Sequence, residues 1–292
     1  MKRPTRIKRG LLEGWVRGMG MNDISPRLWT YSPANSPIPL PDRPLLFTPE
    51  TVISLSSFSS NCSHDETLNR KGVEAYVAGF GSESTSLSDL LLAHDAPPLT
   101  ERKAVLLLGE LANPYRLQDM GMGVLPLIPV RLEGLCRTWA DALDPRESYP
   151  GVHHVTLART PGWWELAYIG MASKDQLMLI KEWLENGIRG SWRPVKLGEG
   201  NLRFEHDMAL QPPHEGDVQW DGTEEHVSIP IPEATGPSLD LNDIMVLVHA
   251  RQGCYNHRGR LARCAHINQR SFHENLFRKG SSHRWDAILT LR

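Results

Sequence analysis

A basic, glycine-rich segment at residues 187–200 has the composition of a phosphate-binding loop. It holds three cations within eight residues, with no acidic residue between positions 188 and 198: Arg189, Arg193 and Lys196. Four glycines share the segment: Gly187, Gly190, Gly198 and Gly200. Glycine allows positive φ angles and a close approach of the backbone to a ligand. Because cations and backbone amides together suit a phosphate chain, the segment predicts a site for a nucleic-acid backbone.

A second basic group lies in the C-terminal tail at residues 251–292. Its central cations are Arg258, Arg260 and Arg263, and the interleaved aromatic residues are Tyr255, Phe272, Phe277 and Trp285. Guanidinium groups pair with phosphates and aromatic rings stack on bases, so we expect RNA contact here as well. The alternative is intramolecular: residues 205–243 hold ten acidic residues and no lysine or arginine, and the tail could dock on them.

The same tail holds four residues of the kinds that bind zinc: Cys254, His257, Cys264 and His266. They fall within 13 residues, and His273 is an alternative fourth ligand. Thiolate and imidazole groups are the usual ligands of structural Zn²⁺. Under the competing interpretation the two cysteines are small buried side chains. Structural zinc is therefore a candidate cofactor, and the sequence requires none.

The adjacent residues His153 and His154 are the candidates for acid–base chemistry, since histidine titrates nearest to neutral pH. On a strand they would point to opposite faces, so only one could enter a site. Cleavage of RNA needs a base for the ribose hydroxyl and an acid for the leaving oxygen, and one strand histidine does not supply both. We therefore expect no catalytic residue, and we keep an endoribonuclease that uses His153 or His154 as the alternative.

Local patterns predict the elements around the basic segment. Residues 164–169 resemble a strand. Ser173 and Gln176 match a capping box, which predicts a helix that begins there. Its apolar stripe is Leu177, Ile180 and Leu184. Asn186-Gly187 ends the helix, with Gly187 expected in the left-handed conformation. The basic segment would then form a hairpin that leads into a strand at residues 201–204.

This arrangement resembles the RAMP superfamily of CRISPR proteins. Ferredoxin-like (RRM-like) units of that superfamily carry a loop with an apolar residue and a glycine, several residues including Lys or Arg, and then Gly-x-Gly and two apolar positions. The matching positions are Ile188, Gly190, Arg193, Lys196, Gly198, Gly200 and Leu202. Three departures occur: a long stretch between Gly190 and Gly198, the extra Arg189, and Arg203 in the final apolar pair. About forty residues carry the resemblance.

The resemblance implies an α+β fold and a role in antiviral defence. Ninety-two residues follow Gly200, whereas processing endoribonucleases of the superfamily carry the loop near the C-terminus. The layout is more similar to the subunit that caps the five-prime handle of the guide RNA (crRNA), and in particular to its type IV version. The implied function is a non-catalytic crRNA-binding subunit of a CRISPR effector. Its implied partners are crRNA, the backbone and large subunits and, as a further candidate, target DNA. A structural assembly protein without an RNA role is the third alternative.

The rest of the chain divides into a basic N-terminal arm at 1–20, a RAMP-like domain at 21–250 and the irregular basic tail at 251–292. We expect an insertion of hairpins and loops around 54–125. Helices are expected over 87–94, 101–111 and 132–143, while two prolines argue against a central strand at 121–130. Because the tail has few large aliphatic residues, we expect contacts from outside its own core to order it: the acidic stretch before it, a bound metal or RNA phosphates.

Composition narrows the class of protein. The 292 residues carry a formal net charge of −2, which argues neither for nor against a nucleic-acid partner. The four cysteines are too few and scattered for a disulfide framework, which favours a reducing cytoplasm: Cys62, Cys136, Cys254 and Cys264. No secretory signal is present, and no run approaches the roughly 18 apolar residues of a membrane span. We therefore expect a soluble, cytoplasmic protein without a membrane partner.

Overall fold

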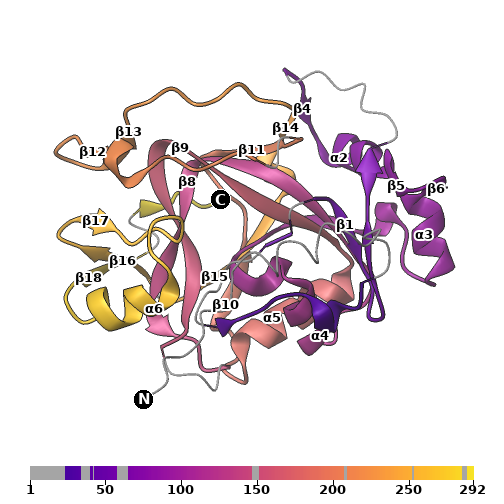
Figure 1. The fold of residues 1–292 in the computed structure, drawn as a ribbon, viewed down its shortest axis with the longest axis horizontal. Coiled ribbons are helices and arrows are strands. Elements are labelled where there is room, and N and C mark those ends of the chain that lie inside the picture. The colour runs from indigo at the N-terminus through magenta and orange to yellow at the C-terminus, as the bar shows by residue number, and fades with distance from the viewer. Residues whose placement is uncertain are drawn as a thin grey trace, which may run out of the picture.

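The fold is of the mixed α+β class and is centred on two long strands. The computed structural model describes residues 24–33, 40–41, 43–57, 65–146, 151–206, 209–251, 253–284 and 288–292. Strands β8 (Leu125–Leu143) and β9 (His153–Ala172) run antiparallel through the molecule (Figure 1). Within the described residues they belong to a 13-stranded mixed sheet. The expected N-terminal arm at 1–20 lies outside the described residues.

The main path of this sheet runs in the order β10-β15-β7-β9-β8-β11-β14-β4. Its remaining strands are β10 (Trp192–Val195), β15 (Met245–His249), β7 (Lys103–Leu107), β11 (Asn201–Phe204), β14 (Ser238–Leu239) and β4 (Thr67–Leu68). Neighbours on the path pair antiparallel, except that β15 is parallel to β7 and β14 is parallel to β4. The path therefore places β10 and β11 on opposite sides of β9.

Shorter strands complete the β structure. β1 (Leu45–Phe47) pairs with β8 and with β2 (Val52–Ser54). β16 (Gly253–His257) pairs with β17 (Arg260–Leu261), with β18 (Ser281–Arg284) and with β8. Two small separate sheets are formed by β12 (Val218–Trp220) with β13 (Glu225–Val227), and by β3 (Ser56–Ser57), β5 (Phe80–Ser82) and β6 (Thr85–Ser86).

Helices cover both faces of the sheet because its central strands are apolar on both sides. In β7, Val105 and Leu107 pack with α5 (Lys174–Glu185) and α4 (Pro114–Asp119), whereas Ala104 and Leu106 belong to the core that includes α2 (Arg70–Ala78) and α3 (Leu87–Ala93). The tail adds α6 (Gln269–Ser271) and the π-helical turn Phe272–Leu276. The described residues also form 3-10 turns at Pro26–Leu28, Leu99–Glu101, Gly109–Ala112, Glu215–Asp217 and Leu241–Asp243. None of the helices in the described part of the chain is both long and apolar enough to cross a membrane.

The predicted capping box of α5 is confirmed, and it is anchored in the core. The Ser173 hydroxyl accepts from the Gln176 amide at 3.3 Å, while Gln176 Oε1 accepts from the Ser173 amide at 3.0 Å. Gln176 Oε1 also accepts from Arg102, which is fully buried and donates to the carbonyl oxygens of Pro97, Val124 and Met171. Burial lowers the pKa of Arg102 to about 10. These bonds fix the start of the helix that leads to the basic segment.

Several expected elements are corrected by the structure. The helices predicted over 101–111 and 132–143 are wrong, because these residues form β7 with short 3-10 turns and half of β8. The strand that the prolines argued against exists: Pro126 lies before the pairing of β8 with β9 begins, and Pro129 lies where the partner of β8 changes from β1 to β11. Residues 54–125, expected as an insertion, contribute β4 and β7 to the main sheet.

The tail is not irregular in its described part. Cys254 on β16 pairs with Ala140 on β8, and an isolated bridge joins Thr138 to Arg263. Cys254, Tyr255 and Phe272 are buried in the same core as the sheet. Contacts from outside the tail therefore order it, as expected: the central strands contact it directly, and the acidic stretch contributes Glu225, which pairs with Arg263.

Candidate nucleic-acid interface

The first half of the basic segment is held against the end of α5. Asn186 caps the helix in the left-handed conformation, and Gly187 and Gly190 follow with φ angles of 84° and 79°. Gly187 was expected in this conformation, and Asn186 adopts it as well. The Glu185 carboxylate accepts from the Gly190 amide and from the Lys181 ammonium, each at 2.6 Å. The hydrogen bond from Lys181 is the main cause that lowers the pKa of Glu185. The loop therefore has a defined shape before any ligand binds.

The three predicted cations of this segment are exposed. Arg189 lies in the turn between α5 and β10, Arg193 lies on β10 at the edge of the sheet, and Lys196 follows β10 directly. Among the residues that the structure describes, neither Arg189 nor Lys196 forms an ion pair with a carboxylate. A phosphate chain that follows this edge could contact all three side chains from solvent.

Gly198 and Gly200 have a different environment from the one expected. Gly198 donates its amide to the Thr290 carbonyl at 2.8 Å, and an added Cβ would lie 2.8 Å from Thr290 Cγ2. Gly200 has a φ of 79°, and its Cβ would lie 2.7 Å from Leu135 Cγ. Their close backbone contacts are thus made with this chain. The hairpin expected over 187–200 is wrong, since β10 pairs with β15 while β11 pairs with β8 and β14.

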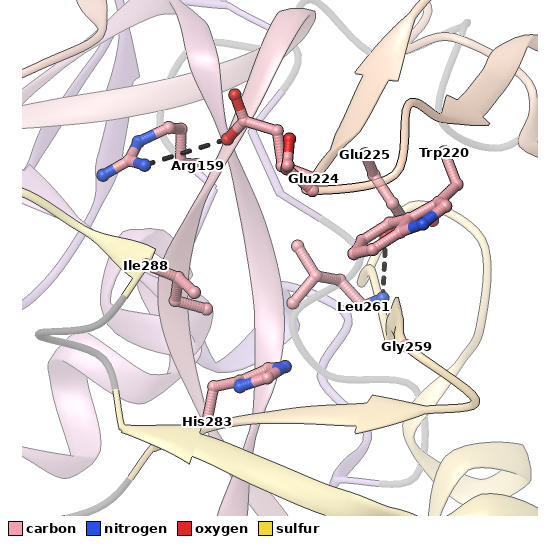
Figure 2. Close-up of a pocket in the computed structure, with 9 residues that line it drawn as sticks. Arg159, Trp220, Glu224, Glu225, Gly259, Leu261, His283 and Ile288 are labelled. Atoms are coloured by element: carbon pink, nitrogen blue, oxygen red, sulfur yellow. Dashed lines mark hydrogen bonds and ion pairs between the residues drawn. The ribbon is translucent and has the colours of Figure 1, made fainter.

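Glu199, between these two glycines, joins the basic segment to a pocket. Its carboxylate accepts from Arg159 on β9 at 2.5 Å and from the Thr290 amide at 2.5 Å. Arg159 also lies 3.8 Å from Glu224. The pocket has a volume of about 360 Å³, and four stretches of chain line it (Figure 2): Arg159 on β9, residues 220–225 at the β12–β13 turn, residues 259–261 at the β16–β17 turn, and His283 with Ile288.

Of the three tail arginines predicted to bind RNA, two have exposed side chains and one has a buried side chain. Arg258, with a φ of 54°, and Arg260 are exposed at the β16–β17 turn beside the pocket. Arg263 is buried, pairs with Glu225 at 3.0 Å and lies over the Trp163 ring at 5.2 Å. The prediction that Arg263 binds RNA is therefore wrong. For this residue the alternative holds, because Glu225 belongs to the acidic stretch 205–243.

The four predicted zinc ligands are not grouped together in the described structure. The Cys254 thiol is fully buried and donates to the Leu157 carbonyl at 3.1 Å, and burial raises the pKa values of Cys254 and Cys264. His266 Nε2 lies 2.8 Å from the Pro213 carbonyl oxygen. Within the described ranges, no three His, Cys, Asp or Glu side chains are grouped to hold a metal ion. The cysteines therefore match the competing interpretation of small buried side chains.

The two histidines point to opposite faces of β9, as predicted, and both are buried. His153 Nε2 lies 3.0 Å from His273 Nδ1, and the His153 ring packs against Phe272 and Phe277. His154 Nδ1 lies 3.6 Å from Asp144. Burial is the main cause that lowers the pKa of each histidine to about 4, so both are neutral at pH 7. Both imidazole rings are therefore largely removed from solvent in this structure.

Sequence reasoning missed the pocket itself, although one signal was available. Asp221-Gly222 is a typical hairpin turn, and it follows directly after Trp220. Hydrogen bonds from Glu224 and Thr223 lower the pKa of Asp221 to about 2. A tryptophan at such a turn is expected at the surface. Arg159 and His283 carried no comparable local pattern.

No protein-family model matches the chain, and no curated protein or solved structure is significantly similar to it. The fold and the arrangement of the exposed basic residues are therefore the grounds for a functional proposal.

Proposed function

We propose that the protein is a non-catalytic crRNA-binding subunit of a CRISPR effector, of the RAMP type that caps the five-prime handle. The order of elements supports a ferredoxin-like unit. It runs β7-α4-β8-β9-α5-β10, with β9 between β7 and β8, and β10 on the far side of β7. β15 is an addition, since it lies between β7 and β10 and is parallel to β7. The proposed protein partners are the backbone and large subunits, and target DNA is a further candidate ligand.

One observation carries this proposal: the loop between the second helix and the last strand of that unit holds exposed cations. Arg189 lies in this loop, and Arg193 and Lys196 continue the row along the sheet edge. Exposed cations at a rigid edge contact phosphates without sequence preference. The endoribonuclease alternative gains no support, because His153 and His154 are buried.

The test is RNA binding measured over a range of salt concentrations. Replacing Arg189, Arg193 and Lys196 together with Ala should weaken binding of single-stranded RNA with a repeat-derived handle. It should also reduce the salt slope by about 2, because each phosphate contact with a single strand contributes roughly 0.7. The experiment should show no cleavage of the RNA by the wild-type protein.

The matched control removes three exposed lysines outside the segment: Lys71, Lys103 and Lys174. This variant has the same change in net charge, and its affinity and slope should stay close to those of the wild type. Equal losses in both triple variants would show that only net charge matters. Absence of RNA binding by the wild type would favour the structural assembly protein.

A further inference from the structure

The pocket beside Arg159 has the size and construction of a ligand site. Its volume of about 360 Å³ lies in the range of small-molecule sites in proteins. Two β-turns, a strand of the central pair and the C-terminal residues converge on it. In Figure 2, Leu261 and Ile288 face each other across the space, Trp220 lies beside Leu261, and His283 lies below.

The surfaces of this pocket suit a flat apolar ring. The Trp220 side chain is 52% exposed, and it is the only aromatic residue among the exposed large hydrophobics of the described chain. Leu261 and Ile288 are half-buried and provide apolar contact. An exposed tryptophan at the end of a hairpin strand offers a face on which any base can stack.

The polar rim argues against an anion in the pocket. The Arg159 guanidinium is shared between Glu199 and Glu224, so its charge is already balanced. The side chains of Arg159 and Glu224 nevertheless remain 36% and 38% exposed. The rim thus presents hydrogen-bond donors and acceptors together, as the edge of an uncharged heterocyclic base requires.

Cations for the flanking phosphates lie next to the pocket and not inside it. Gly259 lines the pocket, and its neighbours Arg258 and Arg260 are both exposed. On another side, Glu199 connects Arg159 to the basic segment that ends at Gly200. We propose that this pocket binds one unstacked nucleobase of single-stranded RNA, with Arg258 and Arg260 contacting the adjacent phosphates. This inference rests on the proposed RNA-binding function.

The experiment measures RNA affinity and its salt slope for Trp220→Ala and Trp220→Phe. The Ala variant should bind roughly 5- to 150-fold more weakly, which is the range for loss of one base stack. Its salt slope should be unchanged, since tryptophan neutralises no phosphate. The Phe variant should recover most of the affinity. Leu92→Ala, which truncates a 75% exposed side chain on α3, is the control and should bind as the wild type does.

A scan of RNAs that each lack one base locates the nucleotide. At one position, removal of the base should weaken RNA binding by the wild-type protein. The same removal should not weaken binding by Trp220→Ala any further, because that base and the Trp220 ring would contact each other. Arg258→Ala combined with Arg260→Ala should lower the slope by roughly 1.4.

The outcomes separate this inference from the proposed function. If the triple variant of the basic segment loses affinity and slope while Trp220→Ala binds normally, the base pocket is overturned alone. If the wild type binds no RNA, both are overturned. Titration with the four nucleoside monophosphates tests whether the pocket binds a free nucleotide or a base of RNA. Trp220-dependent binding of a free nucleotide, combined with normal RNA binding by Trp220→Ala, would overturn the RNA assignment.

Discussion

Arginines in the described part of the chain are buried beside glutamates, among them Arg131 with Glu205, Arg137 with Glu165 and Arg263 with Glu225. Arg131 also donates to the carbonyl oxygens of Pro232 and Glu233 at 2.7 and 2.9 Å. Removing one member of such a pair leaves an uncompensated buried charge and costs about 3–5 kcal/mol. These arginines therefore serve the fold, and the RNA-binding proposal uses exposed cations such as Arg189 and Arg258.

The buried histidines make stability depend on pH. The pKa of His153 falls from 6.5 to about 4 in the folded chain, chiefly through burial, with His273 facing it. The unfolded chain is therefore protonated first as the pH falls. We expect stability to be complete above pH 6.5 and to be lost between pH 6.5 and 4, by on the order of 3 kcal/mol for this imidazole.

His154 should add a similar contribution, since burial also lowers its pKa to about 4. The groups that face it are Asp144, Arg146, Glu110 and His249. Urea unfolding at several pH values checks this prediction. Replacing His153 with Asn should flatten the dependence between pH 6.5 and 4, whereas replacing the exposed His94 should not. An unchanged profile in His153→Asn would contradict it.

At the scale of elements, local sequence signals predicted the bounds of some helices and strands. α5 begins at the capping box, and β11 and α3 occupy the expected residues. β7 and the second half of β8 were misassigned as helices, because a strand buried on both faces reads as a continuous apolar run that resembles a buried helix. The hairpin error has a similar cause, since β10 and β11 pair with strands far away in the sequence, which no local pattern reveals.

The same reasoning explains which parts of the candidate site were predictable. The cations of residues 189–196 were found because they form one local run of charge. The pocket was not found, since its lining comes from four stretches of chain. Arg263 was misassigned because its partner, Glu225, is 38 positions away and only the fold brings the two together.

Gly200 provides a test of the segment that joins β10 to β11. Gly200→Ala should destabilise the fold more than Gly190→Ala does, although both glycines have a φ of 79°. The added Cβ would lie 2.7 Å from Leu135 Cγ at Gly200, whereas nothing lies within 4 Å at Gly190. Overpacking adds about 1–3 kcal/mol beyond the shared backbone strain. Chemical denaturation of the two variants measures the difference, and equal losses would argue against the tight packing at Gly200.

At the scale of the whole molecule, the acidic and basic stretches of the chain contact each other. Glu205 and Glu225 come from the acidic stretch and pair with Arg131 on β8 and Arg263 in the tail. At the other end of the tail, Thr290 and Arg292 bond to Gly198 and Lys196. Figure 1 shows the yellow tail elements packed beside the central strand pair. The net charge of −2 is small, and some of the acidic and basic residues that it sums are paired inside the molecule. Other cations stay exposed, where a partner could contact them.

These contacts predict that the tail resists proteolysis in the isolated protein. Tyr255 and Phe272 are buried in the main core, so the region 253–284 should be protected without RNA, and adding a chelator should not change this. Phe272→Ala should cost about 3–5 kcal/mol and make the tail the first region cleaved. Arg278→Ala, a change at an exposed position of the same stretch, is the matched control and should leave the digestion pattern unchanged. Mass spectrometry of the fragments identifies the cleaved bonds.

Rapid cleavage of the wild-type tail that only RNA prevents would show that partners order it. Cleavage induced by a chelator would instead restore the zinc hypothesis for Cys254 and Cys264.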